Sequence, residues 1–181
     1  ARQCVRRHIP MKLTPAQWGL TALAAAFLAA HYITWITSLT GTSTFASVAL
    51  VCTQPLFVAF FSYVLFRERT PRRALPGALL ALLGAVTIAL SGLSGQEAQA
   101  TGQEALRSNL LALAGAVLMA AHWLAGQQIR QTLAAEVYTP VLYLITALLL
   151  ALCLPLSGGF RMPLSALPYM AGLVIGSTLL G

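Results

Sequence analysis

The fold is decided by residues 13–66, which read LTPAQWGLTALAAAFLAAHYITWITSLTGTSTFASVALVCTQPLFVAFFSYVLF. This run contains no Asp, Glu, Lys or Arg, and four further charge-free stretches rich in Leu and Ala follow it. A transmembrane helix needs about 20 mostly apolar residues to cross a hydrocarbon core of roughly 30 Å, so the run is long enough for two spans. The sequence therefore predicts an all-α, polytopic transmembrane helix bundle.

The composition of the 181 residues agrees with a bilayer environment, because 58% are hydrophobic and only 8% are charged. The net charge of +7 does not indicate nucleic-acid binding, since most Lys and Arg residues lie in short segments between spans without interleaved aromatics. The three cysteines are scattered, which leaves neither a disulfide framework nor a CxxC metal site. We expect membrane lipid as the surroundings, and no nucleic acid, metal ion or cofactor as a partner.

The charge-free stretches predict six membrane-spanning helices. The expected helices cover residues 16–38, 44–65, 74–93, 109–129, 137–157 and 168 to beyond 181. Their connections are short except for residues 94–108, a polar Gly/Gln/Ala linker loose enough to join two structural halves. The basic start precedes a full-length span and is no cleavable signal peptide. Because the chain lacks an initiator Met and ends inside an apolar run, we expect an internal fragment of a longer protein.

The orientation follows from the Lys and Arg residues on each side of the predicted spans, because cytoplasmic loops retain positive charge. One side holds nine: Arg2, Arg6, Arg7, Lys12, Arg67, Arg69, Arg72, Arg73 and Arg130. The other side holds two, Arg107 and Arg161. The count predicts a multi-pass protein of the cell membrane with a cytoplasmic N-terminal segment and the 94–108 linker outside.

A short internal sequence repeat supports a division of the chain into two halves. Residues 15–20, PAQWGL, open the first span, and residues 168–173, PYMAGL, open the last with the same Pro-x-x-x-Gly-Leu spacing. By the charge count these two helices cross the membrane in opposite directions. Inverted-topology repeats of this kind are common in secondary transporters.

The chain resembles a known family in residues 27–39 (FLAAHYITWITSL), 46–56 (ASVALVCTQPL), 67–69 (RER) and 77–84 (GALLALLG). The Pro in mid-helix, the Glu at that helix's cytoplasmic end and the Gly-x6-Gly helix after it are its most specific features. On these residues the chain is similar to the EamA domain of the drug/metabolite transporter superfamily. Residues 110–116, LLALAGA, look like the start of the second repeat.

The resemblance implies an inner-membrane exporter of small-molecule solutes, built as ten helices in two inverted five-helix repeats. The six spans predicted for this chain would then correspond to helices three to eight of the ten. Residues 1–93 would end the first EamA repeat, residues 94–108 would be an extracytoplasmic linker, and residues 109–181 would begin the second repeat. The motifs are loose apolar patterns. The sequence does not decide whether the protein forms a homodimer.

Polar residues inside spans are the candidate substrate-binding residues, because a polar ring in a membrane interior needs a partner, water or a ligand. His31, Trp35 and Ser38 recur at i, i+4 and i+7 on one face of the first helix, and His122 lies in the fourth. We expect His31, Trp35 and His122 to line a solute cavity. The alternative for both histidines is a neutral ring hydrogen-bonded across helices.

Pro55 lies near the middle of the second span and deprives a carbonyl near Val51 of its helical donor. Such a break is tolerated where it faces neighbouring helices or a wet cavity, and Thr53 and Gln54 are polar at the same depth. We expect a helix break at Pro55 with Gln54 as a substrate-binding residue. A structural kink satisfied by a nearby Ser or Thr is the equal alternative.

Small residues predict packing surfaces, because they let helices approach closely. Gly77 and Gly84 lie on one stripe of the third helix, and Gly115 lies with Ala112 and Ala116 on the fourth.

Two rival functions follow from other features. Residues 92–95, GLSG, match the Gly-x-Ser-Gly pattern of intramembrane serine proteases, but Ser94 closes a helix, whereas such a nucleophile should open one. A channel or structural subunit is the second rival, although no ring of charges is visible. We expect no enzyme. The sequence does not identify the substrate, the coupling ion or the direction of transport.

Overall fold

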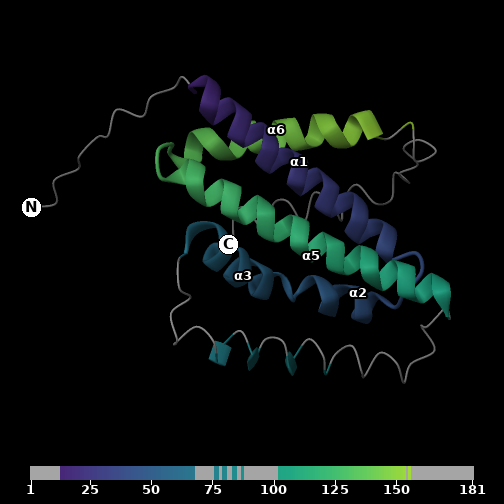
Figure 1. Ribbon diagram of the computed structural model, residues 1–181. Coiled ribbons are helices and arrows are strands. Elements are labelled where there is room, and N and C mark those ends of the chain that lie inside the picture. Colours follow the sequence, from purple (N-terminus) through teal and green to yellow (C-terminus); the bar gives the residue numbers. More distant parts are fainter. Residues whose placement is uncertain are drawn as a thin grey trace, which may run out of the picture. The chain divides into compact units, whose positions relative to one another are not determined.

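The computed structural model describes residues 13–67 and 102–153, with single positions between 76 and 87 and residue 155. Every element in these ranges is helical, which confirms the all-α class. The helices in Figure 1 are α1 (Pro15–Ser38), α2 (Thr44–Val51), α3 (Gln54–Phe66), α5 (Gln103–Arg130) and α6 (Ala135–Cys153).

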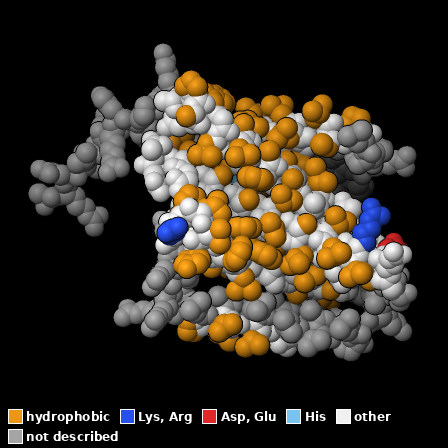
Figure 2. Space-filling model, in the orientation of Figure 1, with side chains coloured by type: hydrophobic (Ala, Val, Ile, Leu, Met, Phe, Trp, Pro, Cys, Tyr) orange, Lys and Arg blue, Asp and Glu red, His pale blue; other side chains and the backbone are white. Residues whose placement is uncertain are grey.

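Four helical segments of the described chain are long and apolar enough to cross a membrane. They are Pro15–Ser38, Thr44–Phe66, Gln103–Arg130 and Ala135–Cys153. Figure 2 shows hydrophobic side chains across the middle of one face, with the few described charged ones toward its edges. The chain is therefore a multi-pass helical membrane protein. The predicted span at 168–181 lies outside the described residues, as does most of the span at 74–93.

The fourth predicted helix begins earlier than expected, which corrects the boundary of the 94–108 linker. Gly102, with φ 71°, precedes α5, so Gln103 to Ser108 are helical instead of linker. Polar residues are no obstacle to a helix that extends beyond the hydrocarbon, and Glu104 in the first turn interacts favourably with the helix dipole. The polar residues at this point therefore did not mark the start of the helix.

The second predicted span is two helices instead of one. Cys52 and Thr53 interrupt it between α2 and α3, two residues before Pro55. The Leu50 carbonyl accepts hydrogen bonds from the Thr53 amide (3.1 Å) and hydroxyl (2.6 Å). Thr53 thus supplies two donors to the Leu50 carbonyl inside the break, whereas the carbonyl that Pro55 leaves without its helical donor is that of Val51.

The chain divides into two compact units, Ala1–Leu149 and Leu150–Gly181. In the first unit α5 contacts α1 on one side and α2 and α3 on the other (Figure 1). A capping box begins α1, in which the Thr14 hydroxyl accepts from the Gln17 amide and the Thr14 amide donates to the Gln17 side chain. The Gln17 side chain also donates to the Thr132 hydroxyl just after α5 (3.2 Å).

The two helices α1 and α5 are therefore antiparallel, since the start of α1 meets the end of α5. At the opposite end the Ser108 hydroxyl lies against Gly41, where an added Cβ would collide with it. The seam between the helices consists mainly of small buried side chains. They are Ala24, Ala25, Ala29, Ala112, Ala116 and Ala120, each less than 5% exposed. In a bilayer, where apolar burial gives little driving force between helices, such residues permit the close approach that packing requires.

Candidate functional site

A cavity of about 350 Å³ lies between α3 and α5, beside the helix break. It is lined by Gln54, Pro55, Val58, Trp123, Gln127 and Arg130. The three α5 residues recur at i, i+4 and i+7, so one face of α5 carries all of them. On the other wall, Gln54 and Pro55 open α3 near the middle of the 23-residue span Thr44–Phe66.

Arg130 gives this cavity a positive charge. Its Cζ lies 6.0 Å from the centroid of the Trp123 ring, within reach of a cation–π interaction. Its Nε–H donates to the Gly126 carbonyl one turn earlier (3.3 Å). The cavity therefore combines a cation, an aromatic face and the amides of Gln54 and Gln127, and no carboxylate is among its described lining residues.

His31 lies at the α1–α5 seam, where its side chain is 3% exposed. Its Nδ1 is 2.9 Å from the Gly115 carbonyl oxygen. Because a carbonyl oxygen can only accept, Nδ1 carries the proton, and in the neutral ring Nε2 is an acceptor. Trp35 stacks on this ring, with centroids 5.8 Å apart and planes 21° from parallel. Within the described chain the buried Trp35 Nε1 has no hydrogen-bond partner.

His122 makes the reciprocal bond. Its Nδ1–H donates to the Ala24 carbonyl of α1 (3.0 Å). Each helix thus sends one histidine to a carbonyl of the other, at points seven residues apart on both helices. The same four-residue pattern surrounds them, Ala-Ala-His-Tyr at 29–32 and Ala-Ala-His-Trp at 120–123. Comparison of these segments is the sequence signal that would have predicted the pairing.

The structure separates the predicted substrate-binding residues into two places. His31 and Trp35 lie at the level of Gly115, whereas Gln54 borders the α3–α5 cavity with Trp123, the neighbour of His122. Gly115 and Trp123 are about 12 Å apart along α5 at about 1.5 Å per residue. The role of each as a solute contact stays a prediction.

Ser38, on the predicted face of His31 and Trp35, is fully buried between α1 and α2. Its hydroxyl donates to the Trp35 carbonyl (2.6 Å), so the Ser47 hydroxyl donates to Ser38 in turn (2.6 Å). This pair fastens α2 to α1.

The glycines predicted to pack differ in what surrounds them. A Cβ at Gly115 would lie 3.2 Å from the Thr34 hydroxyl and 3.5 Å from His31 Nδ1. Among the described residues no atom lies within 4 Å of a Cβ added at Gly77 or Gly84. Ser94 lies outside the described residues.

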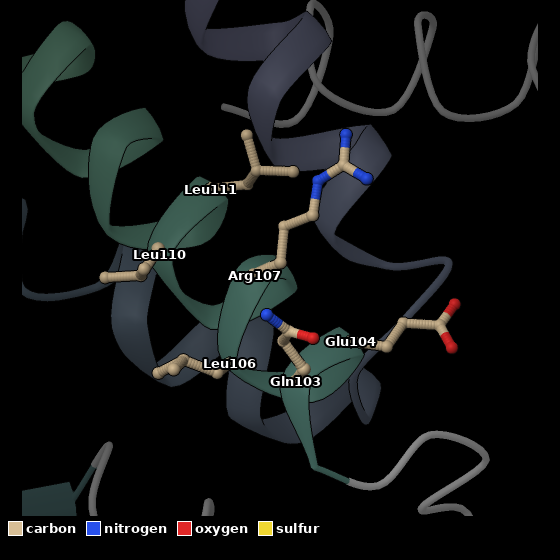
Figure 3. Close-up of a pocket in the computed structure, with 6 residues that line it drawn as sticks. All are labelled: Gln103, Glu104, Leu106, Arg107, Leu110 and Leu111. Atoms are coloured by element: carbon tan, nitrogen blue, oxygen red, sulfur yellow. The ribbon is translucent and has the colours of Figure 1, made fainter.

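Two other concave regions lack converging polar groups. One, of about 780 Å³, has all of its described lining residues on α5, between Gln103 and Leu111. Figure 3 shows that its side chains fan out from the helix, with the Arg107 guanidinium and the Glu104 carboxylate pointing apart. The other, of about 520 Å³, is almost wholly apolar, with Phe57, Phe60 and Phe61 in its wall. In the described ranges no three His, Cys, Asp or Glu side chains gather to hold a metal ion.

Sequence reasoning missed the contribution of α5 to the α3–α5 cavity. In the sequence Arg130 served only as a charge that sets the topology, and Trp123 and Gln127 were not singled out. Their shared helical face was the available signal, with the same spacing as His31, Trp35 and Ser38.

A comparison with protein-family models matches residues 4–90 to the EamA-like transporter family. Residues 4–90 belong to the EamA-like transporter family. The family match confirms the resemblance found in the sequence and identifies a membrane transporter of the drug/metabolite type. The EamA-like segment contains His31, Trp35, Gln54 and Pro55, and α5 lies beyond it. Comparisons of the chain with curated proteins and with solved structures gave no match.

Proposed function

We propose that the protein is an alternating-access carrier that exports small metabolites or drugs across the cell membrane. The observation that carries this proposal is the α3–α5 cavity at the Cys52–Thr53 break, a largely apolar site into which Gln54, Gln127 and Arg130 bring polar groups. Secondary transporters hold their substrates where membrane helices are interrupted near the midplane. Membership of residues 4–90 in the EamA-like transporter family supports the same function.

In this proposal the chain supplies helices three to eight of ten. Residues 1–93 end the first inverted repeat, residues 94–108 connect the repeats outside the cell, with their last part helical, and residues 109–181 begin the second. The N-terminal segment is cytoplasmic. The antiparallel start-to-end contact of α1 and α5 is compatible with it, since it brings the end of α5 that carries Arg130 to the side where α1 begins.

The α1–α5 pair acts as the fixed side of the pathway and α3 as the moving side. Hydrogen bonds from Gln17, His31 and His122 tie α1 to α5 and its following turn, along most of the seam. None of the described side chains of α3 is fully buried, and α3 is separated from α2 by the break. Rocking of α3 at the break would open the cavity with little loss of packing.

The predicted residues act at two points on this pathway. Gln54 contacts solute in the α3–α5 cavity. His31, Trp35 and His122 form a second part of the pathway along the α1–α5 seam, where the Trp35 Nε1–H is a buried donor without a partner among the described residues. An unpaired buried donor costs about 1–3 kcal/mol, which a solute acceptor or a water would recover.

Transport assays on the full-length protein test this proposal. His31→Ala, Trp35→Ala, Gln54→Ala and His122→Ala are compared for efflux of amino acids and cationic drugs, with membrane abundance measured in parallel. Trp18→Ala, at a 48% exposed tryptophan of α1, is the matched control. Reduced efflux at normal abundance in the four variants alone supports the pathway.

Unchanged efflux in all four variants would refute the pathway. Flux that saturates with solute concentration distinguishes a carrier from a channel. Ser94→Ala leaves efflux unchanged if the protein is a carrier, whereas a serine protease would lose its activity.

A further inference from the structure

The cavity between α3 and α5 has an electrostatic character that the proposed function does not use. Arg130 is the one charged residue in the part of its lining that the structure describes. The segments Pro15–Ser38 and Thr44–Phe66 contain no Asp or Glu, so neither α1 nor α3 brings a counter-charge to it. Arg130 and Trp123 are both exposed, so the cavity is open to an incoming ligand, and a guanidinium there favours an anionic partner that it can bind through two N–H groups.

The contacts of Arg130 orient its guanidinium for such a partner. Nε donates to the Gly126 carbonyl and Cζ lies 6.0 Å from the Trp123 ring centroid, and among the described residues the two terminal nitrogens have no hydrogen-bond partner. Two parallel N–H groups match the two oxygens of a carboxylate or phosphate. The guanidinium can therefore offer two N–H donors to an anion beside the Trp123 ring.

The remaining lining residues limit the rest of the ligand. Trp123, Val58 and Pro55 offer apolar surface, while the amides of Gln54 and Gln127 provide neutral donors and acceptors. A volume of about 350 Å³ is near the lower end of the roughly 300–1,000 Å³ typical of ligand pockets. The cavity suits a small molecule with one anionic group and an aromatic or aliphatic body.

We infer that the α3–α5 cavity binds small organic anions, with Arg130 holding the carboxylate and Trp123 packing on the apolar body. This inference rests on the proposed function, because it names the class of solute that the carrier takes. The headgroup of an anionic lipid has the same charge chemistry, so the test separates the two sources.

Binding is measured with the purified full-length protein in phosphatidylcholine nanodiscs. The probe is indole-3-acetate, and its neutral counterpart of the same shape is indole-3-acetamide. The unaltered protein should bind the acid at least about tenfold more tightly than the amide, as expected for a charged hydrogen-bonded pair. Arg130→Gln should remove this preference, and Arg130→Lys, which keeps the charge without the fork, should retain part of it.

The control is Arg107→Gln, which removes an arginine at the opposite end of α5 and should leave the preference intact. Equal binding of acid and amide, or an acid preference that survives Arg130→Gln, would overturn the inference. So would an Arg130-dependent association with phosphatidylglycerol nanodiscs in the absence of any indole-3-acetate binding, since the occupant would then be lipid. Acid binding without any flux would count against the carrier proposal, whereas saturable flux without discrimination between acid and amide counts only against this inference.

Discussion

Gly115 offers the most direct test of the α1–α5 seam. Its carbonyl accepts the His31 Nδ1–H, and an added Cβ would lie 3.2 Å from the Thr34 hydroxyl and 3.7 Å from the Trp35 Cβ. Gly115→Ala therefore requires a shift of a few tenths of an ångström. Gly115→Leu places three further carbons in the same space, which α1 can admit only by moving away and breaking the His31 bond.

The expected cost of Gly115→Leu follows from these contacts. Overpacking of a close-packed site costs about 1–3 kcal/mol, and loss of an interhelical hydrogen bond in a membrane protein adds about 0.6 kcal/mol. The better helix propensity of Leu over Gly offsets about 0.8 kcal/mol. We expect a net loss of about 1–3 kcal/mol, with Gly115→Ala closer to the unaltered protein.

The measurement is reversible unfolding of the full-length protein in mixed micelles. Ala114→Leu is the matched control, because Ala114 precedes Gly115 but is exposed among the described residues, so the same side chain does not enter the α1–α5 seam. The seam would be disproved if Gly115→Leu were no less stable than Ala114→Leu.

Three further predictions follow from the seam, the charge count and the small residues. His31→Ala and His122→Ala should each lower the free energy of unfolding by about 0.6–1.7 kcal/mol. The two losses should add in the double variant, since the two hydrogen bonds lie about 10 Å apart, and a strongly non-additive sum would indicate a shared network. A cysteine introduced by Gln99→Cys should react with an impermeant reagent outside intact cells and one introduced by Thr70→Cys should not, and the reverse pattern would contradict the topology. Gly84→Leu should reduce folded protein in the membrane, while changing the preceding leucine to isoleucine should not; equal yields would mean that Gly84 faces lipid.

The membrane spans were predictable because charge is so costly in hydrocarbon that its absence marks them. The charge-free run 13–66 forms two helical segments of membrane-spanning length, Pro15–Ser38 and Thr44–Phe66. Their bounds lie within about two residues of the predicted ones. The start of α5 at Gln103 was not predicted, because polar residues outside the hydrocarbon are compatible with both helix and loop. Pro55 indicated a disturbed helix, but only the structure shows that the break falls at Cys52 and Thr53.

The partners of the polar side chains were much harder to predict. In a soluble helix the apolar stripe identifies the buried face, whereas α1 is apolar on nearly all sides and its exposed residues include Leu23, Ile33 and Ile36. A histidine in such a helix needs a partner, yet periodicity does not say which helix provides it. Arg130 was overlooked for a different reason. An arginine at the end of a span is already explained by the membrane topology, so its position suggests no further role.

The His31–Gly115 hydrogen bond also has a consequence for biosynthesis. The two residues are 84 positions apart, and chains are made at about 5–20 residues per second, so Gly115 follows His31 by about 4–17 s. During this interval α1 has been made and its acceptor has not. The ring must meanwhile bond to water, a lipid headgroup or the insertion machinery, and slower translation between α3 and α5 would lengthen its exposure to quality-control proteases.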